Sequence, residues 1–262
     1  MISELSQRDS RSFSDRLLCL ALDVGEGMLK SGGEIHRVEE SIEMICKAYG
    51  VAHVEVFAIT SLIVASIRLD NGEYSVQMRR VHNSSNHLVR MEKFNSISRE
   101  ICASAPSLDE FEQMIQDAKK QTSYPQLLYV LGGMLTSGAF AVVFGGSLFD
   151  AAVAAIMGLV VILSNLIDIK NVNPAAKCVF ISFLCGVLTC TLVHFGIGHN
   201  EHKIMIGTIM LLVPGIAFGN SMRDMLDGDI IAGMCRLIQS CLTAVMIAVG
   251  FGLAIFITGV LL

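Results

Sequence analysis

Two arginines and three aspartates stand close together late in the chain, and such side chains are suited to holding a carboxylate rather than to breaking a bond. Arg223 and Asp224 precede Asp227 and Asp229, and Arg236 follows. A guanidinium can hold a carboxylate through two parallel hydrogen bonds, so both arginines are candidate ligands for a small carboxylate. Arg236 is the sharper candidate, because a charge inside an apolar stretch is costly unless it is paired or faces a cavity. An anchor that reaches back to the membrane interface is the alternative for this arginine.

The three aspartates allow several roles. They can pair with the arginines, bind a substrate ammonium or carry a coupling proton, and a solvated loop is the alternative for all three. For Asp229 the favoured interpretation is the N-cap of the next helix.

An apolar span broken by Pro214-Gly215 leads directly into these charges. A break at membrane depth leaves backbone groups unpaired, which persists only where they are buried in protein or line a polar cavity. The sequence therefore predicts a substrate pathway here. Its members are Pro214, Gly215, Asn220, Arg223, Asp224, Asp229 and Arg236, with Asn165 and Asp168 from the end of an earlier span. An ordinary turn at Asn173-Pro174 is the favoured alternative for that earlier polar run.

A second polar motif joins the first two predicted helices at Ser31-Gly32-Gly33-Glu34 and continues to Arg37 and Glu39. A helical hairpin, with a left-handed glycine turn and Glu34 at a helix N-terminus, explains most of it. The functional alternative is a polar cluster of Gly33, Glu34, Arg37 and Glu39 that faces the inner mouth of the membrane domain. His36 is predicted to be a surface residue.

The elements that must position these residues divide into two regions of different polarity. Of the 43 charged residues, 32 lie in residues 1–124. The sequence predicts a soluble α+β domain over residues 1–124 and a membrane α-helical domain with five transmembrane helices over 125–262. A helix capped by Ser14-Asp15 and a second one ending at Gly50 begin the first domain. Strands at 54–57, 62–67 and 74–80, with a turn at Asn71-Gly72, and helices at 86–104 and 107–120 complete it.

Each apolar span is judged against the roughly 20 residues that cross a bilayer. The five predicted spans are about 126–144, 149–167, 177–197, 203–219 and 230–262. The last span is long, and its start at 230–240 is predicted to be an interfacial or cavity-facing helix. Basic residues between the spans place the N-terminus in the cytoplasm and the C-terminus outside a cytoplasmic membrane. The polar start of the chain shows no signal peptide.

Composition narrows the function further. A net charge of −5 argues against nucleic-acid binding. The eight cysteines form no CxxC pair and are predicted to be reduced packing residues. We expect no metal and no cofactor, because the three histidines of the predicted outer loop are loosely spaced. Asp150 is expected to start a helix, and glycines of the first span are expected to serve helix packing.

Taken together, these motifs resemble the threonine/serine exporter family, which includes a two-subunit dicarboxylate-exporting branch. The residues that carry the resemblance are Ser31-Gly32-Gly33-Glu34, Arg37-Val38-Glu39, Pro214-Gly215, Asn220, Arg223-Asp224, Gly228-Asp229, Gly233 and Arg236. The resemblance implies a cytoplasmic domain followed by five spans, and fused members carry a second set of spans. Because this chain stops at Leu262, it resembles the long subunit of a split transporter that needs a short membrane partner or assembles as a homo-oligomer.

Three function classes remain in view. The favoured one is an exporter of small carboxylate-bearing metabolites, such as threonine, serine or succinate, or its large subunit. No phosphate-cradling motif is visible, so proton-motive force is the expected drive. A regulatory or scaffolding subunit is the first alternative. A membrane-anchored hydrolase is the second, with Ser31, Thr60 or Ser61 as nucleophile but no GxSxG or HExxH frame.

Overall fold

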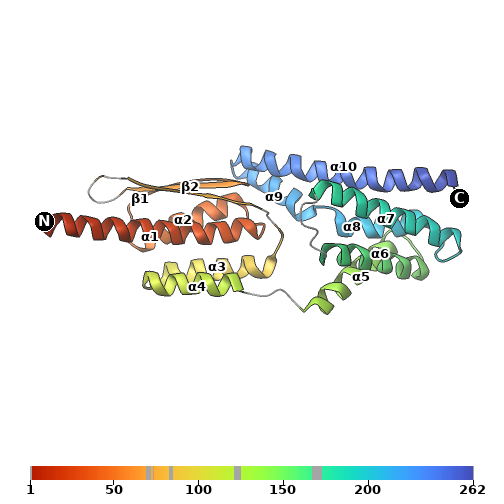
Figure 1. The fold of residues 1–262 in the computed structure, drawn as a ribbon, viewed down its shortest axis with the longest axis horizontal. Coiled ribbons are helices and arrows are strands. Elements are labelled where there is room, and N and C mark those ends of the chain that lie inside the picture. The colour runs from red at the N-terminus through yellow and green to blue at the C-terminus, as the bar shows by residue number, and fades with distance from the viewer. Residues whose placement is uncertain are drawn as a thin grey trace. The chain divides into compact units, whose positions relative to one another are not determined.

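The computed structural model describes residues 2–68, 72, 74–82, 85–120, 125–166 and 173–261, and it is mostly helical with one small sheet (Figure 1). The first part contains α1 (Ile2–Lys30), α2 (Ile35–Ala48), β1 (His53–Ile59), β2 (Leu62–Arg68), β3 (Tyr74–Arg80), α3 (Leu88–Ser104) and α4 (Leu108–Lys120). The second contains α5 (Gln126–Val143), α6 (Leu148–Leu166), α7 (Pro174–His194), α8 (Glu201–Leu212), α9 (Gly215–Leu226) and α10 (Ile230–Leu261).

By its internal contacts the chain forms two compact units. Unit 1 comprises residues 1–123 and 216–237, and unit 2 comprises residues 124–215 and 238–262. Helix α9 and the first turns of α10 thus belong with the N-terminal elements. The predicted assignment of residues 1–124 to the cytoplasm and 125–262 to the membrane stays a prediction.

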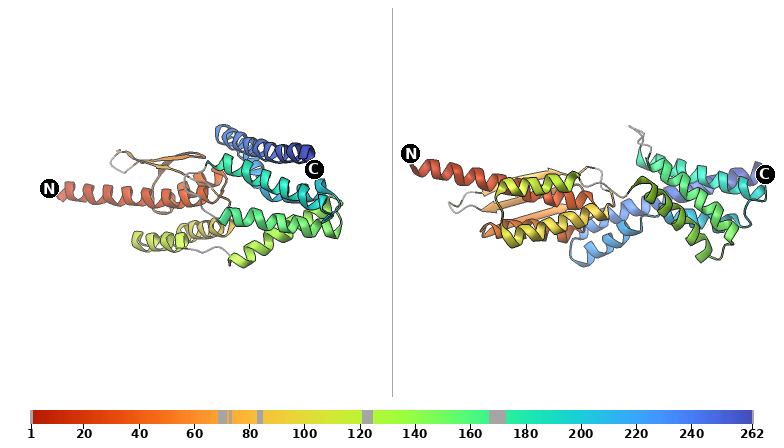
Figure 2. Two further views of the ribbon diagram at one scale, coloured as in Figure 1. Left: turned by 45° about the vertical axis from the view of Figure 1, so that its right-hand side comes forward. Right: turned by 90° about the horizontal axis from the view of Figure 1, so that it is seen from below.

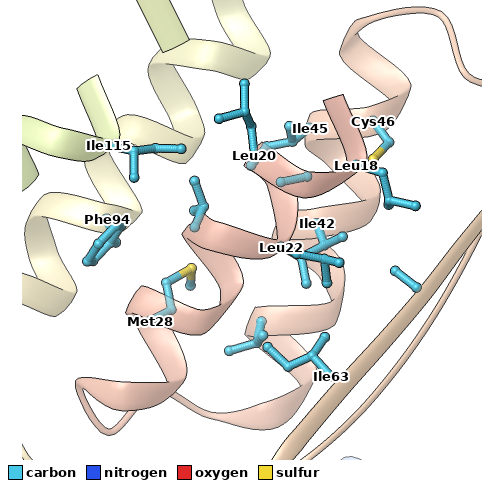
Figure 3. Packing of buried hydrophobic residues seen from close by; sticks show 14 of the residues in the cluster. Leu18, Leu20, Leu22, Met28, Ile42, Ile45, Cys46, Ile63, Phe94 and Ile115 are labelled. Atoms are coloured by element: carbon cyan, nitrogen blue, oxygen red, sulfur yellow. The ribbon is translucent and has the colours of Figure 1, made fainter. Parts of the chain in front are cut away.

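Unit 1 is built around α1 and α2, which lie between the sheet and the helices α3 and α4. Apolar residues at helical spacing give α2 one buried face of Ile35, Val38, Ile42 and Ile45. The core also includes Leu18, Leu22 and Met28 of α1, Ile63 of β2 and Phe94 of α3, as Figure 3 shows. Burying each such side chain contributes roughly 1.5–3 kcal/mol, so this layered core holds the turn between α1 and α2 in place.

The three strands form an antiparallel sheet in the order β1-β2-β3, as the sequence predicts. Val56 pairs with Ala65, and Ile67 pairs with Ser75. In β2 every second residue is buried, because one face of the sheet packs on α1 and α2 (Figure 2). Gly72 has a positive φ of 85° between β2 and β3, and its predicted turn partner Asn71 lies outside the described residues.

Unit 2 consists of α5 to α8 and the C-terminal part of α10. Glycines let these helices approach closely. A Cβ on Gly158 of α6 would lie 2.9 Å from the carbonyl oxygen of Gly133 on α5, so the predicted packing role is confirmed there. Gly132, in contrast, has open space where its side chain would be.

Among the residues that the structure describes, four helices are long and apolar enough to cross a membrane, namely α5, α6, α7 and α10. A fifth span is obtained if α8 and α9 form one broken span. The number therefore agrees with the predicted five spans only when this broken pair is included. All eight cysteines are free thiols, as predicted.

Several predicted boundaries were wrong. Helix α1 begins at Ile2 rather than after Ser14-Asp15, since nothing in residues 2–13 breaks a helix. Helix α7 begins at Pro174 rather than 177, because Asn173 caps it through a 2.9 Å hydrogen bond from the Ala175 amide. Pro174 then occupies the first helical position, where no amide is needed.

The error that matters for the site concerns α9. The polar run after Gly219, which reads as the end of a span and a turn, is helical to Leu226, and the chain turns only at Asp227-Gly228. Residues 230–240, predicted to be an interfacial or cavity-facing helix that leads into the last span, are the first turns of α10, which is uninterrupted over 32 residues. Each helical turn supplies the backbone hydrogen bonds of the next, so polar side chains alone do not end a helix.

Candidate functional site

The candidate site lies in unit 1, at the turn between α1 and α2. The Gly32 amide bonds the Leu29 carbonyl at 3.1 Å, and the Gly33 amide bonds the Met28 carbonyl at 3.0 Å. This pair of bonds is the Schellman motif, which requires a left-handed residue after the helix. Gly32 supplies it with a φ of 91°. The turn brings Glu34 to the N-cap of α2, as predicted.

Replacing Gly32 with alanine is expected to destabilise this turn. An L-residue with left-handed φ costs about 1–2 kcal/mol, and the new Cβ would lie 2.6 Å from Oδ1 of Asn86. The matched control is Gly50→Ala, since Gly50 has a φ of 85° but nothing within 4 Å of the added Cβ. Thermal unfolding of the purified chain checks this. Equal losses for both variants would show that the contact with Asn86 contributes nothing.

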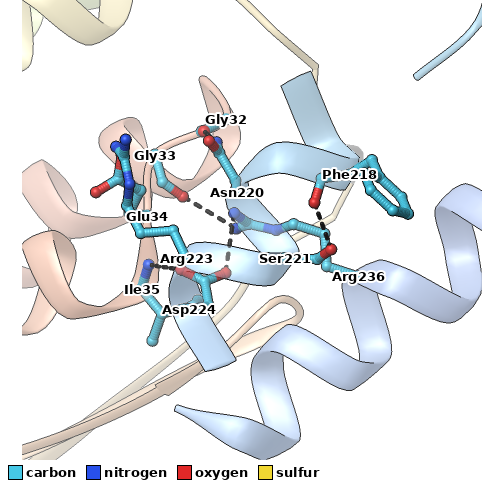
Figure 4. A network of polar contacts seen from close by, with 10 residues as sticks. All are labelled: Gly32, Gly33, Glu34, Ile35, Phe218, Asn220, Ser221, Arg223, Asp224 and Arg236. Atoms are coloured by element: carbon cyan, nitrogen blue, oxygen red, sulfur yellow. Dashed lines mark hydrogen bonds and ion pairs between the residues drawn. The ribbon is translucent and has the colours of Figure 1, made fainter. Parts of the chain in front are cut away.

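A buried ion pair faces the turn from α9 and α10 (Figure 4). Oδ2 of Asp224 lies 3.1 Å from NH1 of Arg236, and the two side chains are 0% and 10% exposed. Oδ1 of Asp224 accepts a 3.0 Å hydrogen bond from the Ile35 amide. NH2 of Arg236 donates to the Gly33 carbonyl at 3.0 Å. The guanidinium therefore bridges the carboxylate of α9 and the backbone of the turn.

The electrostatics of the ion pair depend on its position at the N-terminus of α2. The first amides of a helix lack partners and carry a partial positive charge, which makes this position a site for an anion. Here the carboxylate of Asp224 fills that site, and Arg236 balances its charge. A buried ion pair needs further hydrogen bonds to offset its loss of hydration, and the Ile35 amide and the Gly33 carbonyl supply one to each partner.

Two further contacts surround the pair. Nδ2 of Asn220 donates to the Gly32 carbonyl at 2.9 Å, and Arg223 forms an ion pair with Glu34. The Arg223 side chain is 62% exposed, so this second pair contributes little to stability. The predicted pathway residues Asn220, Arg223, Asp224 and Arg236 and the predicted motif residues Gly33 and Glu34 thus meet in one network.

A cavity of about 200 Å³ adjoins the network and shares the turn and Asn220 with it. Arg37 lines this cavity and is exposed. Glu39 lies elsewhere, where its Oε1 accepts a 2.6 Å hydrogen bond from the Ala58 amide and so ties α2 to β1. Burial raises the pKa of the Glu39 carboxyl, against the lowering effect of that bond. The structure thus places Glu39 apart from the network, in a contact that holds the fold, and its predicted role in the polar cluster stays a prediction.

The other predicted site residues lie outside this network. Pro214 and Gly215 follow α8 in unit 2, where the break is as predicted. Asn165 is exposed near the end of α6, also in unit 2, and Asp168 lies outside the described residues. Asp229 stands immediately before α10, the position expected of an N-cap. Its backbone carbonyl accepts a 2.9 Å hydrogen bond from the Gly233 amide.

Sequence reasoning missed the residues that α3 and the segment before it contribute. Asn86 and Asn95 line the cavity, yet neither belongs to a recognisable motif. The available signal was these two side-chain amides themselves. Asn86 stands at the start of the helix predicted at 86–104, and Asn95 lies within it. Ser31, a candidate nucleophile for the hydrolase alternative, is buried and donates its hydroxyl to the Gly27 carbonyl at 2.7 Å. This hydrogen bond gives Ser31 a structural role.

Unit 2 holds a separate polar cluster at the start of α6. The buried carboxylate of Asp150 accepts hydrogen bonds from the amides of Ser147 at 2.8 Å, His199 at 2.7 Å and Asn200 at 3.0 Å. The predicted helix-start role is confirmed, and the carboxylate also fixes the loop before α8. Within the described ranges, no three His, Cys, Asp or Glu side chains are placed to hold a metal ion.

The fold and the site define a class: a helical protein with several candidate membrane spans and a buried ion pair where one of them begins. The chain belongs to the threonine/serine exporter family, because it matches the family described as "Putative threonine/serine exporter" over residues 19–258. The family resemblance drawn from the motifs is thereby confirmed.

Curated relatives are distant but cover most of the chain. The "Threonine/serine exporter" of Corynebacterium glutamicum is 22% identical over 254 residues, which cover 92% of this chain and 51% of that protein. A "Probable threonine/serine exporter" of Mycobacterium tuberculosis is 22% identical and is covered to 45%. The chain thus spans about half the length of these two relatives. The "Probable succinate transporter subunit YjjP" of Escherichia coli K12 is 22% identical, with 92% of this chain and 94% of that protein covered. No solved structure matches the chain.

Proposed function

We propose that this chain is a transmembrane exporter of small carboxylate-bearing metabolites, such as threonine, serine or succinate, or the large subunit of such an exporter. The observation that carries the proposal is the buried pair of Asp224 and Arg236 at the start of α2. Taking two charges out of water is costly, and buried ionisable groups with a specific charge partner are frequent at functional sites. Family membership supports transport as the activity.

The pair suggests how substrate and proton are coupled. A zwitterionic substrate can replace both halves of the pair, with its carboxylate on Arg236 and its ammonium on Asp224. A proton on Asp224 removes the partner of the ammonium. Proton and substrate therefore compete for Asp224, as export driven by an inward proton gradient requires.

The proposed topology has residues 1–124 on the cytoplasmic side and the C-terminus outside. Helix α10 has 32 residues, which corresponds to about 48 Å at 1.5 Å per residue, and about 20 residues suffice to cross the bilayer core. The turns of α10 that carry Arg236 can thus project into the cytoplasm. The sequence-predicted pathway residues of unit 2, Pro214, Gly215 and Asn165, and also Asp168, remain part of the proposal.

A partner subunit is part of the proposal. The Escherichia coli relative is named as a transporter subunit and has nearly the length of this chain. We propose that a short membrane subunit supplies a second, inverted set of spans, which is the arrangement many secondary transporters use. A second copy of this chain is the alternative partner.

The test is efflux of threonine, serine and succinate from cells that express this chain, alone and with the short subunit encoded near it. We expect efflux that needs Asp224 and that stops when an ionophore collapses the pH gradient. Efflux only with both subunits supports the split exporter, and efflux from this chain alone supports a homo-oligomer. If neither combination exports any of the three metabolites, the regulatory or scaffolding alternative replaces this proposal. Efflux that persists after the gradient is collapsed removes the proton coupling.

A further inference from the structure

The cavity beside the network differs from the ion pair because several of its lining side chains are exposed rather than buried. Its polar lining comes from Glu34, Arg37, Asn86, Asn95 and Asn220, and its apolar lining includes Met28 and Met91. Arg37 and Asn86 are exposed, and Asn95 and Asn220 are partly exposed. A small solute therefore reaches these side chains without any movement of the fold.

We propose that this cavity captures a small zwitterionic amino acid from the cytoplasm before transport. This inference rests on the proposed export function and names the substrate class that the site selects. The volume is about 200 Å³. This is enough room for a molecule of the size of serine or threonine.

The charges of the lining favour a zwitterion over a dianion. The cavity is lined by one cationic side chain, Arg37, and one anionic side chain, Glu34, whose Oε1 also pairs with the exposed guanidinium of Arg223. An amino acid presents one carboxylate and one ammonium, so each finds a group of opposite sign. A dicarboxylate would place its second negative charge in a cavity that already contains Glu34, and like charges disfavour binding.

The amides supply the remaining specificity. Asn86, Asn95 and Asn220 each offer a donor and an acceptor, which suits a short hydroxyl-bearing side chain. Met28 and Met91 offer polarisable apolar surface for a methyl group or for methylene groups. A larger apolar side chain would exceed the volume and leave these amides without partners.

The lining is held by the fold before any ligand arrives. The Ser85 amide donates to the Lys30 carbonyl at 2.9 Å, and the His87 amide donates to the Ser31 carbonyl at 3.1 Å. These bonds fix the segment that carries Asn86 against the turn. Asn220 is fixed by its bond to the Gly32 carbonyl. Preorganisation of this kind lowers the entropy cost of binding.

Occupancy of the cavity would bear directly on the ion pair. Asn220 lines the cavity and lies one turn before Asp224 on α9. A ligand that bonds Asn220 competes with the bond from this side chain to the Gly32 carbonyl. The captured amino acid is thus positioned to loosen the contact between α9 and the turn.

The test is isothermal titration calorimetry of the purified full-length chain in detergent with L-threonine, L-serine and succinate. We expect binding of the two amino acids and at least tenfold weaker binding of succinate. Arg37→Gln and Asn95→Leu should each weaken L-threonine binding about tenfold or more. The matched controls are Lys47→Gln, which also removes one positive charge from α2, and Ser96→Ala, next to Asn95 on the exposed side of α3. Both controls should bind as the unmodified chain does.

The outcomes separate this inference from the proposed function. Binding of succinate in preference to L-threonine, with the same sensitivity to Arg37→Gln, would overturn the ligand class. Amino-acid binding that neither Arg37→Gln nor Asn95→Leu weakens would overturn the site, and so would no heat of binding at all. In each case an unimpaired efflux assay would leave the exporter proposal standing. Binding with the expected pattern in a chain that exports nothing would support the site and remove the transport role.

Discussion

Arg236→Ala is expected to abolish efflux and to lower the free energy of unfolding by about 3–5 kcal/mol, the typical cost of removing one partner from a buried ion pair. The variant leaves the carboxylate of Asp224, which is 0% exposed, without its counter-ion. It also removes the donor to the Gly33 carbonyl. Arg236→Lys should lose less stability but most of the efflux, since one ammonium cannot reproduce the planar guanidinium that reaches both partners.

The double variant Asp224→Asn with Arg236→Gln separates stability from transport. It removes both charges together, so most of the stability lost in Arg236→Ala should return. Efflux should remain absent if the charges act in the pathway. Thermal unfolding and efflux assays on the same variants measure the two effects, with Gln239→Ala on the exposed side of α10 as the control. A double variant that recovers full efflux would show that the pair only clamps the fold.

Gly233→Ala is expected to have the second largest effect, because it lies where α10 crosses α9. An added Cβ would lie 2.5 Å from Cγ of Met225, 2.8 Å from the Ser221 carbonyl oxygen and 3.0 Å from the Met225 amide nitrogen. Two of these atoms are backbone, so the helices must move apart. Overpacking of this kind costs about 1–3 kcal/mol. Because Arg236 and Asp224 stand next to this crossing, the shift should also weaken their contact and reduce efflux.

The control for Gly233→Ala is Gly252→Ala on the same helix. Nothing lies within 4 Å of a Cβ at Gly252, so alanine there should be neutral or stabilise the helix by up to about 1 kcal/mol. Thermal unfolding of the purified chain and efflux from cells measure both variants. Unchanged stability and efflux in Gly233→Ala would mean that the close crossing of α9 and α10 is not needed for the site.

The strands and most helices of unit 1 were predictable because their signals are local. The change from a helical period to alternation marks β1 and β2, and Gly32 marks the turn after α1. The extent of α9 was not predictable in this way. The residues after Gly219 have the polar composition of a loop, yet they belong to α9. The polar face of α9 contacts the turn between α1 and α2 and the side chain of Arg236.

The roles of individual polar residues divide in the same way: some follow from near neighbours in the sequence, and others depend on distant elements. Asp150 starts a helix and accepts a hydrogen bond from the Ser147 amide three positions away, and its place at the start of an apolar span predicted this. Asn173 caps α7 through the Ala175 amide, where the sequence favoured an ordinary turn. Glu39 and Arg37 stand two residues apart on α2, yet the first bonds the sheet and the second lines the cavity. No local pattern distinguishes them, because their partners come from other elements.

The sequence by itself determined the family, the two regions of different polarity, the three strands and the Pro214-Gly215 break. These features depend on hydrophobic period, turn chemistry and charge, which act between near neighbours. Only the tertiary structure decided that Arg236 is paired with Asp224 rather than reaching for the membrane interface. It also decided that Asp224 fills the start of α2, 189 residues away along the chain. Such pairings arise when separate helices pack together, and the burial that makes them strong exists only after packing.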